Sequence, residues 1–233
     1  GHQILLLLFL IIGTGAFFIS IRSRYLWYCL PPLFIGYFAF LPFFGIRPQL
    51  LTVFFAAILV KILDNFLANP ASRLIYFCPA LFLIWVNLHG GFFAGLFILF
   101  LILILEVFKK TNIFKQIISW KRLSGQNFQK HSSREIIILL IISAASFLAT
   151  LINPYGLRIY EEVFRTIGDS YLGFYIAEWL PLFSTGAPVF GILYLSLFLG
   201  LLIPQYKKIE FNKLILSIVF LIFALLRQRH FLL

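Results

Sequence analysis

The sequence predicts an all-α protein, a polytopic bundle of transmembrane helices forming one integral-membrane domain over residues 1–233. Hydrophobic residues make up 62% of the chain and charged residues 12%, which is more apolar surface than a water-soluble domain of 233 residues can bury. The apolar runs are long enough to cross a hydrocarbon core of ~30 Å as helices. They are also too long and too uniformly apolar for the strands of a membrane barrel.

Polar, Pro and Gly residues divide the chain into about eight expected spans. The expected spans cover residues 4–21, 25–45, 49–66, 74–88, 91–108, 136–152, 187–204 and 213–227. Pro31 and Pro32 should kink the second span. Lys61 and Asp64, near the end of the third, should pair or approach a membrane interface.

Basic residues are distributed unequally between the two sides that this succession of spans defines. The loops on one side hold 14 of the 19 Lys and Arg residues, and the cations of the opposite side are all arginines. The positive-inside rule then predicts a multi-pass protein of the plasma (inner) membrane with its Lys-bearing side in the cytoplasm. The net charge of +11 follows from this topology, and short basic loops do not form a nucleic-acid-binding face. The arginines of the extracytoplasmic side are Arg47, Arg158, Arg165, Arg227 and Arg229.

Polar residues gather at the helix ends on the extracytoplasmic side. They occur in GIRPQL (45–50), WVNLHGGFFAGL (85–96), LINPYG (151–156), IAEWLP (176–181) and RQRH (227–230). A guanidinium group offers a planar fork of donors that suits phosphate or carboxylate, so this side predicts a site for an anionic ligand at the membrane boundary. The expected substrate-binding residues are Arg47, Asn87, Asn153, Tyr155, Arg227, Arg229 and His230.

Two residues on this side, His89 and Glu178, are candidate catalytic groups. The apolar neighbours of Glu178 disfavour a charged carboxylate unless an Arg pairs with it, so ion pairing is the alternative to acid–base chemistry. His89 could instead cap a carbonyl at a helix end, in a tight hairpin that Gly90 and Gly91 allow. We find no spacing for a metal ion, a phosphate-cradling loop or a serine nucleophile, so we expect no metal and no cofactor.

A shorter amphipathic helix is expected after the sixth span. Asn153 is a good N-cap and Pro154 suits the first helical position, so the helix should start here and end at Gly168. Its apolar residues fall on one face and its charged residues on the other, which is typical of a helix lying along a membrane interface. The charged residues, which can pair at helical spacing, are Arg158, Glu161, Glu162 and Arg165.

The strings RPQLLTVFFAAIL, WVNLHGGFFAGL, LINPYG and AEWLP resemble those of a group of bacterial polytopic membrane proteins. This group is related to the C-type glycosyltransferase (GT-C) fold, as in protein mannosyltransferases and lipid A arabinose transferases. The resemblance covers residues from about 40 to 230. It implies an inverting transfer of a sugar from a polyprenyl-phosphate carrier to an acceptor on the extracytoplasmic side. It also implies that basic residues such as Arg47, Arg227 and Arg229 hold the carrier phosphate.

The resemblance further implies an acidic catalytic base in the first outer loop, which would lie before Gly1. We therefore expect a carboxy-side fragment that lacks amino-terminal helices and this loop, with Glu178 as the acid that could substitute. An O-antigen ligase or polymerase would share the lipid-phosphate site. A transporter and a non-enzymatic membrane assembly subunit are further alternatives, although transporters usually gather polar groups near the membrane midplane.

Overall fold

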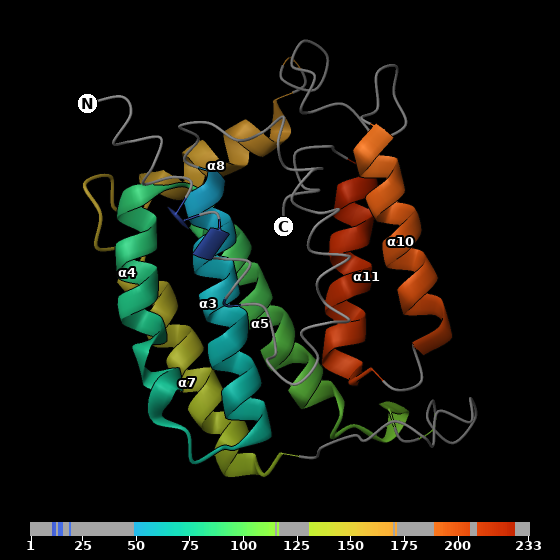
Figure 1. Cartoon of the computed structure of the whole chain (residues 1–233). Helices are drawn as coiled ribbons and strands as arrows, with labels where there is room; N and C mark the ends of the chain where they lie inside the picture. Colours follow the sequence, from blue (N-terminus) through green and yellow to red (C-terminus); the bar gives the residue numbers. More distant parts are fainter. Residues whose placement is uncertain are drawn as a thin grey trace.

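A computed structural model shows that the described part of the chain is all-helical, which confirms the all-α part of the predicted fold class for these residues (Figure 1). The structure describes residues 49–114, 131–169, 189–205 and 209–226, together with a few isolated positions. Apart from isolated positions in the first, the first two expected spans lie outside the described residues. The helices are α3 (Gln49–Ala68), the 3-10 helix η3 (Arg73–Phe77), α4 (Cys78–Leu88), α5 (Phe92–Phe108), α7 (Ser133–Ala149), α8 (Arg158–Gly168), α10 (Val189–Gln205) and α11 (Phe211–Leu226).

The helix boundaries follow local signals in the sequence. Pro79 lies in the first turn of α4, where its missing N–H has no helical partner to lose. Ser132 and Glu135 form a capping box at the start of α7, because each side chain accepts a hydrogen bond from the backbone N–H of the other. The observed helices therefore begin and end within a few residues of the third to eighth expected spans.

One described helix, Gln49–Ala68, is both long and apolar enough to cross a membrane by itself. The apolar segments Arg73–Leu88, Phe92–Phe108 and Phe211–Phe223 are shorter. The structure therefore confirms the helices, whereas the eight membrane crossings stay a prediction.

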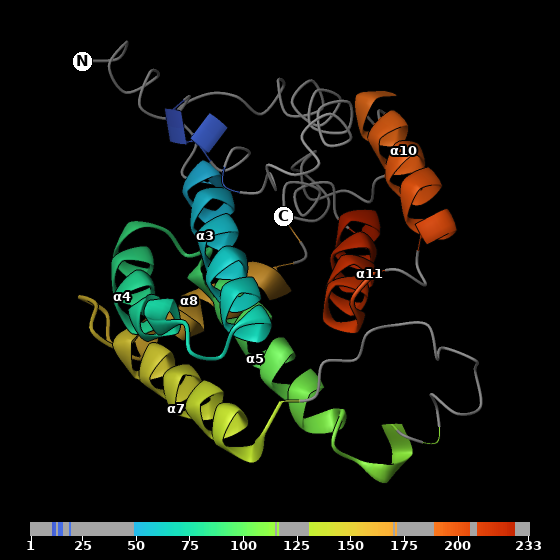
Figure 2. The same ribbon diagram turned by 60° about the horizontal axis from the view of Figure 1, so that its bottom comes forward.

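Helices α3, α4, α5 and α7 pack into one bundle, and α11 contacts this bundle along α5 (Figures 1 and 2). The core of the bundle is formed by buried apolar residues of α3, α4, α5 and α7. Trp85 and Phe82 are fully buried there, and their rings stack with centroids 5.7 Å apart. A Cβ atom at Gly95 would stand 2.4 Å from the Trp85 ring, so a glycine is required for this approach of the two helices.

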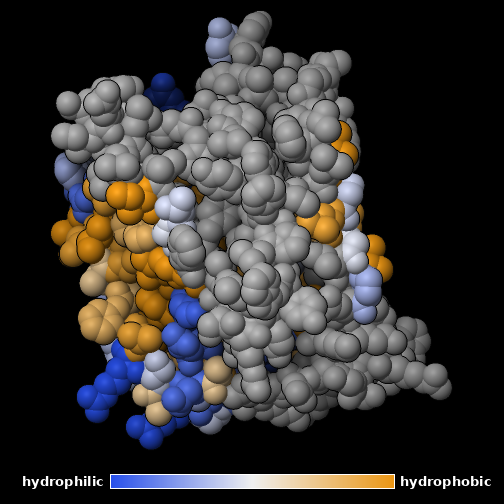
Figure 3. Space-filling model, viewed as in Figure 1, coloured by the Kyte–Doolittle hydropathy of each residue, from blue (hydrophilic) through white to orange (hydrophobic). Residues whose placement is uncertain are grey.

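Helix α7 buries two serines beside two apolar residues, Leu139 and Ile142, and exposes a row of apolar side chains on its opposite face. Ser143 and Ser146 are 0% exposed against the bundle, whereas Ile141 and Leu148 are each 59% exposed. The small serine side chains let the helix backbones approach closely. A helix that faces water would instead bury its apolar side chains and expose its polar ones. Figure 3 shows another face of the bundle, the one on which α4 lies, where a band of hydrophobic side chains stands above a hydrophilic margin.

The two ends of the bundle differ in charge. At one end lie the starts of α3 and α5, the end of α4, and α8, which runs across the helices; we call this the hairpin end (Figure 1). The opposite end, where α3 and α5 end and α7 and α11 begin, is called the basic end. The described basic residues toward the basic end are Lys61, Arg73, Lys109, Lys110, Arg134 and Lys213, and those at the hairpin end are Arg158 and Arg165.

Asp64 is paired at the basic end. Its carboxylate lies 3.1 Å from Nζ of Lys213, which joins α3 to α11. The expectation that Lys61 and Asp64 pair or approach an interface is thus confirmed for Asp64, and its partner comes from the last described helix.

Candidate functional site

The turn between α4 and α5 holds His89 in a fixed orientation. His89 ends α4 in an extended conformation, with its backbone N–H still donating to the carbonyl of Trp85. Its ring Nδ1 accepts a hydrogen bond from the backbone N–H of Gly91 at 3.1 Å and lies 2.6 Å from the Thr52 hydroxyl on α3. Since a backbone N–H can only donate, Nδ1 carries a lone pair and the ring proton resides on Nε2.

The same turn explains why the two neighbouring glycines differ in importance. A Cβ atom at Gly91 would lie 1.8 Å from Oγ1 of Thr52 and 2.8 Å from Nδ1 of His89. At Gly90 no atom lies within 4 Å of an added Cβ. Gly91 therefore lets α3 and the turn approach each other, whereas Gly90 faces open space.

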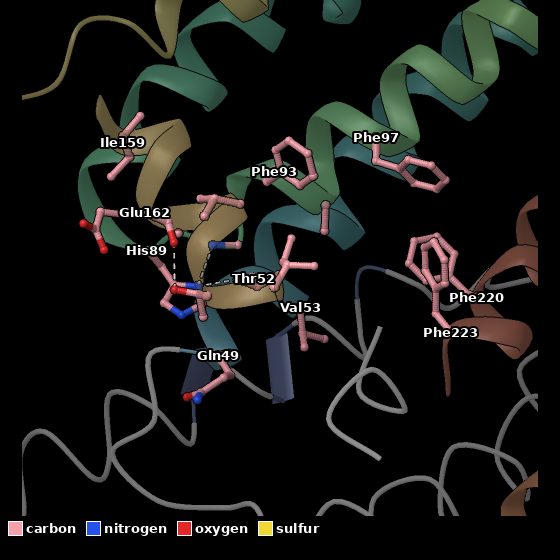
Figure 4. A pocket seen from close by; sticks show the side chains of 16 residues that line it. Gln49, Thr52, Val53, His89, Phe93, Phe97, Ile159, Glu162, Phe220 and Phe223 are labelled. Carbon is pink, nitrogen blue, oxygen red and sulfur yellow. Dashed lines mark hydrogen bonds between the residues drawn. The ribbon is translucent and has the colours of Figure 1, made fainter. Parts of the chain in front are cut away.

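A cavity of about 450 Å³ lies beside this turn, between α3, α5, α8 and α11 (Figure 4). Gln49, Thr52 and His89 lie together at one end of it, and Phe220 and Phe223 of α11 lie at the other. Between them the wall is apolar, and it includes Val53, Phe93, Ala94, Phe97, Ile159 and Val163. Such a cavity matches the size of small-molecule sites, which are mostly apolar with a few placed polar groups.

The polar groups of the cavity have different hydrogen-bonding states. The Oε1 atom of Gln49 is buried and has no hydrogen-bond donor in the described part of the chain. Thr52 is 5% exposed and engages His89. Glu162 of α8 lies 3.5 Å from Arg165 in a pair whose side chains are 66% and 80% exposed, so water screens their attraction.

Helix α8 is the amphipathic helix that the sequence predicts, and it ends at Gly168 as expected. Ile159, Tyr160 and Val163 pack against the bundle core. The Tyr160 hydroxyl contacts that of Thr150 at the end of α7, and burial raises the pKa of Tyr160. Because α8 forms one side of the cavity, these contacts fix that wall.

The start of α8 differs from the prediction. The helix begins at Arg158, so the expected start at Asn153 and Pro154 is wrong. The Asn153 side chain instead accepts a hydrogen bond from the N–H of Tyr155 and donates to the carbonyls of Thr150 and Gly156. These bonds close a turn in which Gly156 adopts φ 55°, a conformation that side chains with a Cβ disfavour.

Asn87, Asn153 and Tyr155, three expected substrate-binding residues, lie at the hairpin end but do not line the cavity. Asn87 Nδ2 donates to the carbonyl of Leu83 at 2.8 Å and to that of Ile152 at 2.9 Å, so it ties the end of α4 to the turn after α7. Tyr155 is 68% exposed. The structure thus brings His89 to the cavity and gives the two asparagines structural hydrogen bonds. The remaining expected site residues, which lie outside the described residues, are Arg47, Glu178, Arg227, Arg229 and His230.

Sequence reasoning missed two features of this structure. The first is Gln49, an uncharged residue two positions after Arg47. The second is a buried polar cluster at the basic end, where Glu106 accepts hydrogen bonds from Lys109 at 2.7 Å and Asn212 of α11 at 2.6 Å. The isolated acid in the apolar run LILILEVFKK is a signal that could have indicated it.

The cluster extends to the capping box of α7. His131 is 7% exposed, and its Nδ1 lies 3.0 Å from the carboxylate of Glu135. A hydrogen bond from the backbone N–H of Ser132 lowers the pKa of Glu135, with smaller contributions from the Ser132 hydroxyl and His131. The cluster therefore joins α5, α7 and α11 at the basic end, away from the cavity.

Neither geometry nor similarity assigns a further ligand. Within the described residues, no group of three or more His, Cys, Asp or Glu side chains is arranged to hold a metal ion. Comparison with protein families, characterised proteins and solved structures found no match to the chain. The cavity and the residues around it are therefore the features of the described residues that point to a function.

Proposed function

We propose that the chain is a membrane-embedded, glycosyltransferase-like protein that binds a polyprenyl-phosphate-linked sugar and transfers the sugar to an acceptor on the extracytoplasmic side. One observation carries the proposal: the cavity is apolar over most of its wall, and its polar groups gather at one end, beside the α4–α5 turn. A lipid-linked sugar is likewise divided into an apolar part, its isoprenoid chain, and a polar part, its phosphate and sugar. The resemblance of the sequence to GT-C proteins favours this ligand class.

The inverted polarity of α7 supports a membrane environment. Its outer face exposes Ile137, Leu140, Ile141 and Leu148, while Ser143 is buried within the bundle. In water, a helix exposing this face would lose the hydrophobic stabilisation that apolar burial provides. In a membrane, the same side chains would contact the apolar lipid tails. The hydrophobic band on the α4 side of the bundle, seen in Figure 3, is likewise consistent with a surface that faces lipid.

The distribution of charge supports the proposed orientation. Lysines lie toward the basic end, as the positive-inside rule requires of a cytoplasmic side. The cavity's polar groups and α8 lie at the hairpin end, which is then the extracytoplasmic boundary. A carrier lipid could keep its tail between the helices there while its phosphate meets the aqueous boundary.

The proposed transfer breaks the bond between the sugar C1 and the phosphate oxygen and forms a bond from C1 to an acceptor hydroxyl oxygen, with inversion. The phosphate leaves with the bonding electron pair, and a base takes the proton of the acceptor. The described residues supply lipid and headgroup contacts for this reaction. By the resemblance, the base is an acidic residue of an outer loop.

Filling the cavity should weaken lipid binding. We expect Ala94→Trp, on the α5 wall, to weaken binding of polyprenyl phosphate at least about tenfold, or about 1.4 kcal/mol, because the indole occupies the space of the chain. Binding is measured with a labelled lipid and the full-length protein in nanodiscs. Ala144→Trp is the matched control, since Ala144 is exposed on the outer face of α7. Equal affinity of both variants and the wild type, with no change in thermal stability, would contradict the proposal.

The orientation has a separate test. A cysteine replacing Lys110 at the basic end should be shielded from an impermeant thiol reagent in intact cells, whereas one replacing Arg165 on α8 should react. Permeabilised cells provide the control, because both cysteines should then be labelled. The reverse pattern in intact cells would place the cavity on the cytoplasmic side and exclude an extracytoplasmic transferase.

A further inference from the structure

We infer that the basic end of the bundle binds the phosphate of an anionic phospholipid, through Arg73 and Tyr76 of η3 and Arg134 of α7. The acyl chains of this lipid lie along the exposed apolar faces of α4 and α7. Such a site rests on the membrane environment of the proposed function, but it requires neither the cavity nor the transfer of a sugar.

The three-residue period of η3 sorts its side chains into rows. Ile75 and Cys78, three residues apart, are fully buried against the bundle. Arg73 and Tyr76 form a second row, which is exposed. Phe77 belongs to a third row and is exposed beside them. A cation and aromatic side chains exposed together at the end of an apolar bundle are typical of the boundary between membrane and water.

The chemistry of the exposed polar row suits a phosphate. The guanidinium of Arg73 offers a planar fork of N–H donors. The hydroxyl of Tyr76 can donate beside this fork, because residues i and i+3 of a 3-10 helix lie one above the other. Within the described part of the chain, no acidic side chain pairs with Arg73 and occupies the fork.

Helix α7 brings a second guanidinium to the same end. Helices α4 and α7 pack side by side, and both begin at the basic end (Figures 1 and 2). Arg134 lies in the first turn of α7 and is exposed. The carboxylate of the neighbouring Glu135 accepts the N–H of Ser132 and lies 3.0 Å from Nδ1 of His131, so it is engaged by the capping box. Two adjacent helical segments thus each present an arginine at the bundle end.

Apolar side chains continue from this end along both helices. Helix α4 exposes Ile84 and Leu88, and α7 exposes Ile137 and Ile141. On the α4 side, the hydrophobic band stands above a hydrophilic margin (Figure 3). A phospholipid has matching parts, because its acyl chains can contact the apolar side chains while its phosphate reaches the arginines. Free phosphate would make only the polar contacts, so a lipid is the ligand that fits the whole surface.

The hairpin end provides a contrast. There Arg158 also follows an exposed tyrosine, Tyr155, by three residues. However, α8 carries two glutamates, Glu161 and Glu162, for its two arginines, so its formal charges cancel. An anionic headgroup should therefore be attracted to the basic end and not to α8.

The preference for an anionic lipid tests the site. Phosphatidylglycerol or phosphatidylcholine is titrated into the full chain in detergent, and bound lipids are counted by native mass spectrometry. We expect the wild type to prefer phosphatidylglycerol. Arg73→Gln and Arg134→Gln should each reduce this preference about fivefold, and together about twenty-five-fold, because each guanidinium near the headgroups attracts the anion separately. Tyr76→Phe should reduce it about threefold, because one hydrogen bond is lost.

Arg158→Gln is the matched control and should leave the preference unchanged. The substituted side chains are all exposed, so thermal unfolding in phosphatidylcholine nanodiscs should be the same for every variant. Glycerol phosphate, which has the phosphate without acyl chains, should not displace the bound lipid. If it displaces phosphatidylglycerol at equal concentration, the site takes a free phosphate and the lipid assignment is wrong.

The remaining outcomes separate this site from the proposed membrane environment. If Arg158→Gln reduces the preference as much as Arg73→Gln, binding follows net charge and no site exists at the basic end. If the wild type binds both phospholipids equally, the headgroup site is wrong while the membrane environment stands. If the chain binds neither phospholipid and does not enter nanodiscs, the membrane environment is itself wrong.

Discussion

Gly91→Ala is expected to destabilise the protein by about 3 kcal/mol, at the upper end of what overpacking usually costs. The added methyl carbon would lie 1.8 Å from Thr52 Oγ1 and 2.8 Å from Thr52 Cβ, far inside van der Waals contact. Thr52 is 5% exposed and held between helices, so it cannot move away without shifting α3 from the α4–α5 turn. The loss is measured as a fall in the midpoint of thermal unfolding in detergent or nanodiscs.

Gly90→Ala is the matched control, one residue away in the same turn. No atom lies within 4 Å of its added Cβ, and Gly156 is the described glycine that adopts a positive φ. The change should therefore alter stability by no more than about 0.5 kcal/mol, or stabilise slightly by restricting the unfolded chain. If both alanines cost the same, the close approach of Thr52 to the turn is not what requires Gly91.

Helix positions were predictable because run length and helix-breaking residues are local signals. Gly91 and Pro79 mark helix starts, and they do so whatever the rest of the chain does. The start of α8 was not predictable in the same way. Asn153 followed by Pro154 suits both an N-cap and a turn. The turn is favoured by hydrogen bonds from Asn153 to Thr150 and Gly156, and these bonds form only in the folded chain.

The candidate site was predictable only in part, because its contacts join distant segments. The pattern around His89 indicated a polar hairpin, but its partner Thr52 lies 37 residues earlier on α3. Nothing local indicates that a Gln49 carbonyl will be buried without a donor. The sequence pattern instead predicted arginines as the binding residues, and Arg47, Arg227 and Arg229 lie outside the described residues.

The buried cluster at the basic end was also only partly predictable from local sequence, because its contacts join distant segments. Glu106 and Lys109 are spaced for pairing on one helix, but Asn212, which donates to the same carboxylate oxygen of Glu106, comes 106 residues later.

The position of this buried cluster also bears on the transporter alternative. The buried charged residues of the described helices, Glu106 and Lys109, lie at the basic end, whereas midplane groups between broken helices are typical of transporters.

The largest stability loss is expected for Glu106→Ala, about 3–5 kcal/mol, because one carboxylate serves two buried donors. Its removal leaves the ammonium of Lys109, whose side chain is 8% exposed, and the amide of Asn212 without their acceptor. Since Asn212 lies in the first turn of α11, the change should also loosen the contact between α11 and α5. Thermal unfolding measures the first effect, and hydrogen exchange at the start of α11 measures the second.

Glu162→Ala supplies the comparison, because Glu162 and Arg165 have the same three-residue spacing as Glu106 and Lys109 but are 66% and 80% exposed. Water already solvates these charges, so the loss should be about 0–1 kcal/mol. Replacing Glu106 and Lys109 together, by Leu and Met, should recover most of the stability lost in Glu106→Ala, because no buried charge is then left unpaired. If the double variant is as unstable as the single one, the loss arises from packing around Glu106 rather than from the uncompensated charge of Lys109.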